Sequence, residues 1–98
     1  MLTGKQRAYL RSLAHDIDPI FQIGKYGIEE NFLIQVSQAL EARELIKIKV
    51  LENSGLGTRE ASDLICAKLK CEGIQAIGNK MVLYKKSKKK PKIEIPAK

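Results

Sequence analysis

The sequence has very little of what enzymes and metal sites are built from. Its 98 residues contain a single histidine, His15, and two cysteines, Cys66 and Cys71. One imidazole cannot complete a Ser/His/Asp or Cys/His set, and two thiols fall short of a structural zinc site. We therefore expect no enzyme, no metal ion and no cofactor. Five positions apart on a predicted helix, the two cysteines would point about 140° apart, which favours reduced thiols over a mutual disulfide.

Long apolar runs and nucleotide-binding motifs are also missing. No stretch approaches the roughly 20 apolar residues of a membrane-spanning helix, and the first residues, MLTGKQRAYL, do not resemble a signal peptide. The stretch GKYG is too short for a P-loop, and neither GKS, GKT nor GxGxxG occurs. These absences predict a cytoplasmic protein with no membrane partner, and they speak against an enzyme that holds a nucleotide or another small-molecule substrate.

Positive charge is abundant but unevenly distributed. The chain has 18 lysines and arginines against 11 acidic residues, which gives a net charge of +7. From Lys85 onward there are seven lysines and one acid, Glu94, so six of these net charges lie in the last 14 residues. The length suits one domain, because small chains bury too little surface for two cores. We expect a single domain over residues 1–86 and a basic, flexible tail over residues 87–98.

Apolar periodicity predicts three helices and four strands. The clearest strand alternates Ile46, Ile48 and Val50 with Lys47 and Lys49, which implies a sheet with one buried and one wet face. Strands separated by helices pair in parallel, whereas a tight turn makes the last strand antiparallel to its neighbour. The predicted segments are helices over residues 3–16, 28–43 and 58–72, strands over residues 19–23 and 44–52, and a hairpin over residues 74–86.

The order of these elements, a helix followed by βαβαββ, indicates a fold class. We expect a two-layer α/β domain with a mixed four-stranded sheet, helices on one face and lysines on the other. The carboxyl ends of the parallel strands would then meet at one edge of the sheet. A binding site is expected at that edge.

The stretch Gly24, Lys25, Tyr26 and Gly27 follows the first predicted strand and therefore lies at this edge. Backbone N–H groups between glycines can face a phosphate, the lysine adds positive charge, and a base can stack on the tyrosine ring. The structural alternative is that the glycines only supply the positive φ angle of a turn. A glycine pair at this spacing is a weak motif taken alone, so both interpretations stay open.

Further basic residues are candidates for the same surface. We expect the hairpin turn to bring Lys80 to this edge, and an antiparallel first helix to return Lys5 and Arg7 to it. Arg11 shares a helix face with Arg7. Lys47 and Lys49 could form a secondary phosphate track, although an alternating charged strand is usually only a solvated face.

Several stretches together resemble a known family. They are LTGKQRAYLRSLAH, GKYGIEENF, ALEARELIKIKVL and IGNKMVLYKK, which span residues 2–86 in order. The chain is similar to the YhbY-type, or CRM-domain, family of RNA-binding proteins. The resemblance implies a fold like the C-terminal domain of translation initiation factor three and a GxxG loop at Gly24–Gly27. It also implies association with ribosomal RNA in precursors of the large ribosomal subunit. One departure is Glu29, where the family often has threonine.

Two other classes of function compete with RNA binding. One is an enzyme, which the missing motifs oppose. The other is a generic polyanion-binding or protein-interaction module led by the lysine-rich tail. Deletion of the tail separates the last class from a folded RNA-binding domain, because only the domain would keep its preference for RNA. The protein is expected to be a monomer that binds RNA.

Overall fold

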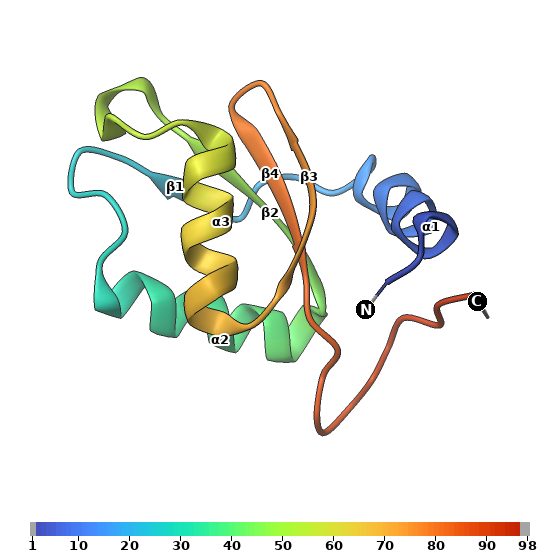
Figure 1. Cartoon of the computed structure of the whole chain (residues 1–98). Coiled ribbons are helices and arrows are strands. Elements are labelled where there is room, and N and C mark those ends of the chain that lie inside the picture. Colours follow the sequence, from blue (N-terminus) through green and yellow to red (C-terminus); the bar gives the residue numbers. More distant parts are fainter. Residues whose placement is uncertain (1, 97–98) are drawn as a thin grey trace.

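The computed structural model describes residues 2–96, which form one sheet with three helices (Figure 1). All predicted helices and strands are present. The α/β class with a mixed four-stranded sheet is confirmed, whereas the likeness to the initiation-factor domain stays a prediction. The elements are α1 (Gly4–Ala14), β1 (Phe21–Ile23), α2 (Glu30–Arg43), β2 (Leu45–Val50), the short 3-10 helix η1 (Glu52–Ser54), α3 (Thr58–Leu69), β3 (Glu72–Ile77) and β4 (Lys80–Tyr84).

The strand order in the sheet is β1-β2-β4-β3. β1 pairs in parallel with β2, and β4 runs antiparallel to both of its neighbours, β2 and β3. The last strand therefore lies between β2 and β3, so β3 points in the same direction as β2 without touching it. The carboxyl ends of β1, β2 and β3 still meet at one edge, together with the β3–β4 turn.

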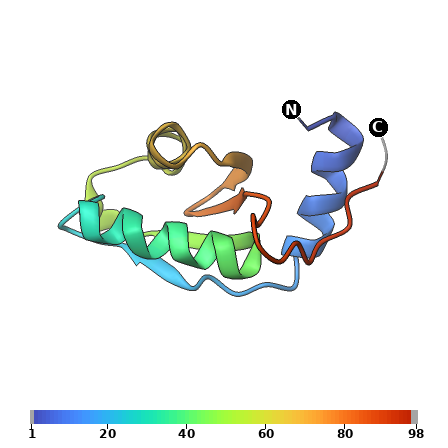
Figure 2. The same ribbon diagram turned by 90° about the horizontal axis from the view of Figure 1, so that it is seen from below.

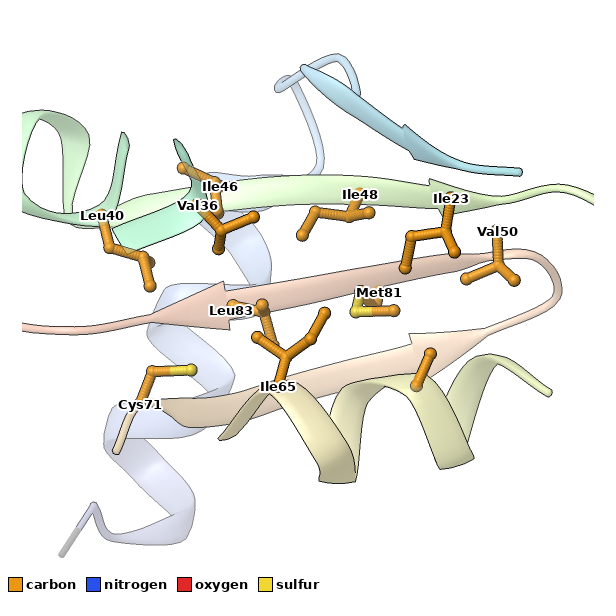
Figure 3. Close-up of a cluster of buried hydrophobic side chains, with 11 residues drawn as sticks. Ile23, Val36, Leu40, Ile46, Ile48, Val50, Ile65, Cys71, Met81 and Leu83 are labelled. Atoms are coloured by element: carbon orange, nitrogen blue, oxygen red, sulfur yellow. The ribbon is translucent and has the colours of Figure 1, made fainter. Parts of the chain in front are cut away.

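The main core lies between the sheet and the helices α2 and α3. Ile46, Ile48 and Val50 project from one face of β2, as their alternation predicts, and Val36 and Leu40 meet them from α2. Figure 3 shows these side chains converging with those of β1, β4 and α3. Apolar burial over this contiguous cluster is the dominant stabilising contribution to the domain.

The helix α1 packs on the opposite face of the sheet, so the prediction of all helices on one face is wrong. Leu10 and Ala14 of α1 are buried in a second cluster with Leu45, Val82 and Tyr84. Both β2 and β4 carry apolar side chains on this second face at one end of the sheet, and water must be excluded from them. In Figure 1, α1 and α3 accordingly lie on opposite sides of the strands.

The helix α1 begins with a capping box. Thr3 Oγ1 accepts a hydrogen bond from the backbone N–H of Gln6 (3.1 Å), and Gln6 Oε1 accepts one from the N–H of Thr3 (3.0 Å). This reciprocal capping box satisfies two otherwise free donors and fixes where the helix begins.

The helix α3 ends earlier than predicted, so Cys71 lies outside it while Cys66 stays within it. It stops at Leu69 because Lys70 adopts the left-handed conformation (φ 57°), and Glu72, the last residue of the predicted helix, begins β3. Cys71 turns into the core, and its Sγ comes within 3.5 Å of Cys66 Sγ. The prediction that the two thiols point apart is therefore wrong, because it assumed an uninterrupted helix.

Residues 87–96 follow a defined path along the domain. Ile93 and Ile95 pack against the second cluster, and Gln6 Nε2 donates a hydrogen bond to the carbonyl of Pro96 (2.9 Å). Figure 2 shows this final segment beside α1. Residues 93–95 themselves form no strand. The boundary at residue 86 and the mobility of the tail in solution stay predictions, and residues 97–98 lie outside the described range.

Candidate nucleic-acid interface

The two glycines after β1 are present for different physical reasons. The N–H of Gly27 donates to the carbonyl of Gly24 (2.9 Å), which closes a turn, and Gly27 has a φ of +68° that only glycine adopts easily. Gly24 needs no positive φ, and a Cβ there would meet Asn53 Oδ1 and Leu51 Cδ1 at an ordinary 3.8 Å. The fold therefore explains Gly27 but not Gly24, which is half-buried beside the loop that carries Asn53.

Between the glycines, Lys25 and Tyr26 both project into solvent. The Tyr26 side chain is 75% exposed, although most tyrosines in a small domain bury part of their ring. Lys25 Nζ lies 5.1 Å from the centre of this ring, which is a cation–π distance. The pair offers a positive charge and a flat aromatic surface next to each other, as contact with a phosphate and a base requires.

The predicted edge is held together by hydrogen bonds between its three loops. The N–H of Leu51 donates to the carbonyl of Ile23 (2.9 Å), and the N–H of Val50 donates to that of Asn79 (2.7 Å). Thr58 Oγ1 donates to the carbonyl of Gly78 (2.7 Å). The glycine turn, the segment after β2 and the β3–β4 turn thus form one rigid border, and Lys80 lies on it as expected. Sequence reasoning missed Asn53, because the position of its loop depends on these contacts.

The start of α2 does not offer an anion site of its own. Glu29 is the N-cap residue, its side chain makes no capping hydrogen bond, and Glu30 follows in the first turn. Both side chains are exposed. Two carboxylates at the positive end of the helix dipole occupy the position that a phosphate would prefer. Any phosphate at this edge must therefore bind to the glycine turn and the lysines rather than to the helix terminus.

The helix α1 covers only one end of its face of the sheet. At the other end of the same face, a row of side chains crosses all four strands. Strand register joins Gln22, Lys49, Lys80 and Ile77, one from each strand in the order β1-β2-β4-β3. Paired residues project from the same face, so these side chains lie next to one another. Lys80 and Ile77 are exposed and Lys49 is half-buried. We call these four residues the sheet row.

Lys47 lies on the same face as the sheet row, two residues from Lys49. It pairs with Val82 and is half-buried, which fits the expected wet side of the sheet only in part. The alternation of lysines in β2 predicted their common face. The sequence could not reveal that Lys49 faces Lys80, because that pairing exists only when β4 lies beside β2. Gln22 and Ile77 were missed for the same reason.

The basic residues of α1 do not return to this edge, so that prediction is wrong. The guanidinium of Arg7 donates to the carbonyl of Gly73, and its other terminal nitrogen lies 3.6 Å from Glu72 Oε1. Glu72 begins β3 and is therefore at the end of the sheet opposite to Lys80. Lys5 and Arg11 are exposed on the same helix. These residues lie away from the edge because α1 packs against the second cluster. Sequence periodicity predicts the helix but not the face of the sheet on which it packs.

Two further findings concern residues 2–96. Within them, no three histidine, cysteine, aspartate or glutamate side chains are grouped so that they could hold a metal ion. No helix in this range has the length and apolar character needed to cross a membrane.

Comparisons with known proteins agree on one family. The model of the CRS1 / YhbY (CRM) domain matches residues 2–85. The probable RNA-binding protein YqeI of Bacillus subtilis is 47% identical over 96 residues, which cover 98% of this chain and 100% of the relative. An RNA-binding protein of Haemophilus influenzae is 34% identical over 97 residues, covering 99% and 97%. The solution structure of SAV1595 from Staphylococcus aureus matches with a TM-score of 0.77 and 47% identity over 98% of this chain and 100% of that one. The chain belongs to the CRS1/YhbY (CRM) domain family.

Proposed function

We propose that this protein binds RNA through the glycine turn, Gly24–Gly27, and the neighbouring sheet row. The observation that carries the proposal is Gly24, a glycine that neither φ nor crowding requires, beside the exposed pair Lys25 and Tyr26. A turn without side chains at its two glycines, an exposed lysine and a free aromatic face suit a phosphate backbone with unpaired bases. Relatives that match over nearly their whole length are named RNA-binding proteins, which supports this choice of ligand.

The RNA in this proposal is ribosomal, and the protein acts as a cytoplasmic, monomeric assembly factor of the large ribosomal subunit. The family resemblance motivates this narrower assignment. It involves no catalytic step, since the surface offers phosphate contacts and a stacking ring rather than an acid, a base and a nucleophile in contact. Co-sedimentation of the protein with large-subunit precursors, compared with mature subunits, tests it.

The direct test is a titration of fluorescent RNA at several salt concentrations. We expect log affinity to fall linearly with log salt, with a slope of about 0.7 to 0.9 per phosphate contact. Lys25→Ala removes one contact and should weaken binding by roughly 1 to 2 kcal/mol, the scale of a charge-assisted hydrogen bond. Equal affinity for RNA and duplex DNA, together with normal binding by Lys25→Ala, would overturn the proposal.

The competing function is that of a generic polyanion binder led by the lysine-rich tail. The observation in its favour is the concentration of six of the seven net charges after Tyr84. Removal of residues 87–98 separates the two functions. A domain that binds RNA through the glycine turn keeps its preference for RNA over DNA after this deletion, whereas a tail-led binder loses its affinity for both.

A further inference from the structure

The carboxylates of Glu41 and Glu44 accept hydrogen bonds from the lysine-rich segment after β4. Glu44 is fully buried, and its two oxygens accept hydrogen bonds from the backbone N–H groups of Ser87 (2.8 Å) and Ile93 (2.7 Å) and from that of Lys92. Glu41 lies one helical turn earlier and accepts from the N–H groups of Lys88 and Lys89 and from the hydroxyl of Ser87. Glu41 in the last turn of α2 and Glu44, the residue that follows this helix, thus bind one short piece of backbone.

These contacts give an ordered shape to a sequence that would otherwise repel itself. A run of like charges normally stays extended and mobile. Here, the N–H of Lys90 donates to Ser87 Oγ (3.1 Å), Ser87 is buried, and Ile93 packs against the second cluster. We call residues 86–92 the lysine turn. Its contacts with the two carboxylates come from backbone N–H groups and from the Ser87 hydroxyl, so the lysine side chains remain free for a partner.

The lysine side chains are exposed and line two grooves beside α2. Within residues 2–96 the ion pairs are Arg7–Glu72 and Arg59–Asp63, and neither involves the lysine turn. One groove of about 380 Å³ lies between α2 and the start of the turn, and another of about 330 Å³ lies between α2 and its end. The groove-lining lysines of the turn are Lys86, Lys88, Lys89, Lys90 and Lys92.

The lysine turn and the glycine turn lie at opposite ends of α2. This helix has 14 residues, so its ends are about 20 Å apart at a rise of roughly 1.5 Å per residue. A nucleic-acid strand with about 3.4 Å between phosphates needs on the order of six phosphates to bridge that distance. One RNA molecule of modest length can therefore touch both ends of the domain.

We infer that the lysine turn is a second, fixed phosphate-binding surface for the RNA, built on the paired carboxylates of Glu41 and Glu44. The inference rests on the proposed function, since it names a second contact of the same ligand. It also gives the lysines after Tyr84 a defined role as contacts at fixed positions, in place of a general positive charge. The lysines act through their position, and the two acids increase RNA affinity although they carry the wrong charge for direct contact.

The test removes the two negative charges of the anchor, a change that by charge alone should strengthen RNA binding, whereas the inference predicts weaker binding. The double variant Glu41→Gln/Glu44→Gln keeps every lysine and raises the net charge by two, so simple electrostatics predicts tighter RNA binding. We expect at least threefold weaker binding instead, because the lysine turn loses its anchor. Asp16→Asn/Asp18→Asn is the matched control, since these exposed acids lie far along the sequence from the turn and bring the same charge change. Its affinity should stay equal or increase slightly.

Backbone ¹⁵N relaxation and circular dichroism accompany the titration. We expect increased motion of residues 87–93 in the double variant with the helices intact. Because Glu44 is buried, Glu41→Gln/Ser87→Ala replaces the double variant if that one does not fold. Equal or tighter RNA binding by a folded anchor variant with a mobile turn would overturn the inference while leaving the proposed function standing. The proposed function itself fails on different evidence, namely normal binding by Lys25→Ala.

Discussion

Lys49 of β2 and Lys80 of β4 are direct cross-strand partners in an antiparallel pair, with their side chains on the same face of the sheet. Like charges in this relation destabilise a sheet, by roughly 0.2 to 1 kcal/mol. No hydrogen bond or ion pair of the described residues brings an acid to either side chain. In the proposed function, a phosphate between the two ammonium groups relieves this repulsion. The pair would then combine a small loss of stability with a phosphate contact.

Replacement of Lys80 should change stability and binding in opposite directions. We expect Lys80→Gln to raise the free energy of unfolding by a few tenths of a kcal/mol, because the repulsion with Lys49 disappears. RNA binding should weaken, and the salt slope should fall by about 0.7 to 0.9, the loss of one phosphate contact. Chemical denaturation and RNA titration measure the two effects.

Lys68→Gln is the matched control for this experiment, because Lys68 is exposed on α3, on the other side of the sheet. It removes the same charge and should leave the salt slope almost unchanged. An equal loss of affinity in both variants would mean that Lys80 contributes only net charge and that the sheet row is a solvated surface.

Acid should loosen the lysine turn before it unfolds the domain. Hydrogen bonds from the backbone of Lys88 and the hydroxyl of Ser87 lower the pKa of Glu41 from 4.5 to about 2. Since the folded pKa lies below the unfolded one, the stabilisation is complete above about pH 4.5 and disappears as the pH falls toward 2. Backbone hydrogen bonds also lower the pKa of Glu44, against the effect of its burial. Its contribution therefore has the same sign.

The measurement is the free energy of unfolding and the ¹H–¹⁵N spectrum between pH 6 and pH 2. We expect the signals of residues 87–93 to change first, with Glu41→Gln removing part of the pH dependence. A spectrum of the lysine turn that stays constant down to pH 2 would show that Glu41 does not hold it.

The two thiols should differ strongly in reactivity. The thiol of Cys71 donates a hydrogen bond to Cys66 Sγ, which lowers the pKa of Cys66 and, together with burial, raises that of Cys71. Because the thiolate is the reactive species, Cys66 should be alkylated first at neutral pH. Mass spectrometry of iodoacetamide-treated protein checks the order. Cys71→Ala removes the donor and should slow the labelling of Cys66, whereas faster labelling would show that burial rather than the hydrogen bond controls this thiol.

Local patterns predicted the elements, and long-range packing decided what the patterns could not. The alternation around Ile48 depends only on near neighbours, and the strand that it predicts is confirmed. Nothing in the sequence indicated a partner for Arg7. This arginine contacts Glu72, 65 positions later, because α1 packs on the second face of the sheet. Gly24 was singled out from its spacing to Gly27, whereas the difference between the two glycines needed the φ angles.

The contacts of the lysine turn were likewise not predictable from the sequence. Composition alone gives a basic tail, since nothing near Lys88 in the sequence opposes its charge. The partners, Glu41 and Glu44, lie more than 40 residues earlier, at the end of α2, and in the sequence they looked like ordinary surface acids. Only the tertiary structure joins the two segments, so neither the anchor nor the fixed position of the lysines was predictable.

The two glycines of the turn should respond oppositely to substitution. Gly27→Ala forces a side chain into the left-handed region and should destabilise the fold by roughly 1 to 2 kcal/mol. Gly27→Asn should keep the turn and most of the stability, because asparagine tolerates the left-handed region better than alanine does.

Gly24→Ala meets no crowding and needs no unusual φ, so the free energy of unfolding should stay nearly unchanged. We expect its methyl group, which would lie beside Asn53 and Leu51, to narrow the space that a phosphate enters at this turn, and RNA affinity should fall by about fivefold, the scale of one hydrogen bond. Denaturation curves and RNA titrations of the three variants decide between two accounts of this turn. Loss of binding without loss of stability in Gly24→Ala identifies Gly24 as a contact with RNA. Unchanged binding in both Gly24→Ala and Gly27→Asn would leave the glycine pair as a connection between β1 and α2 and nothing more.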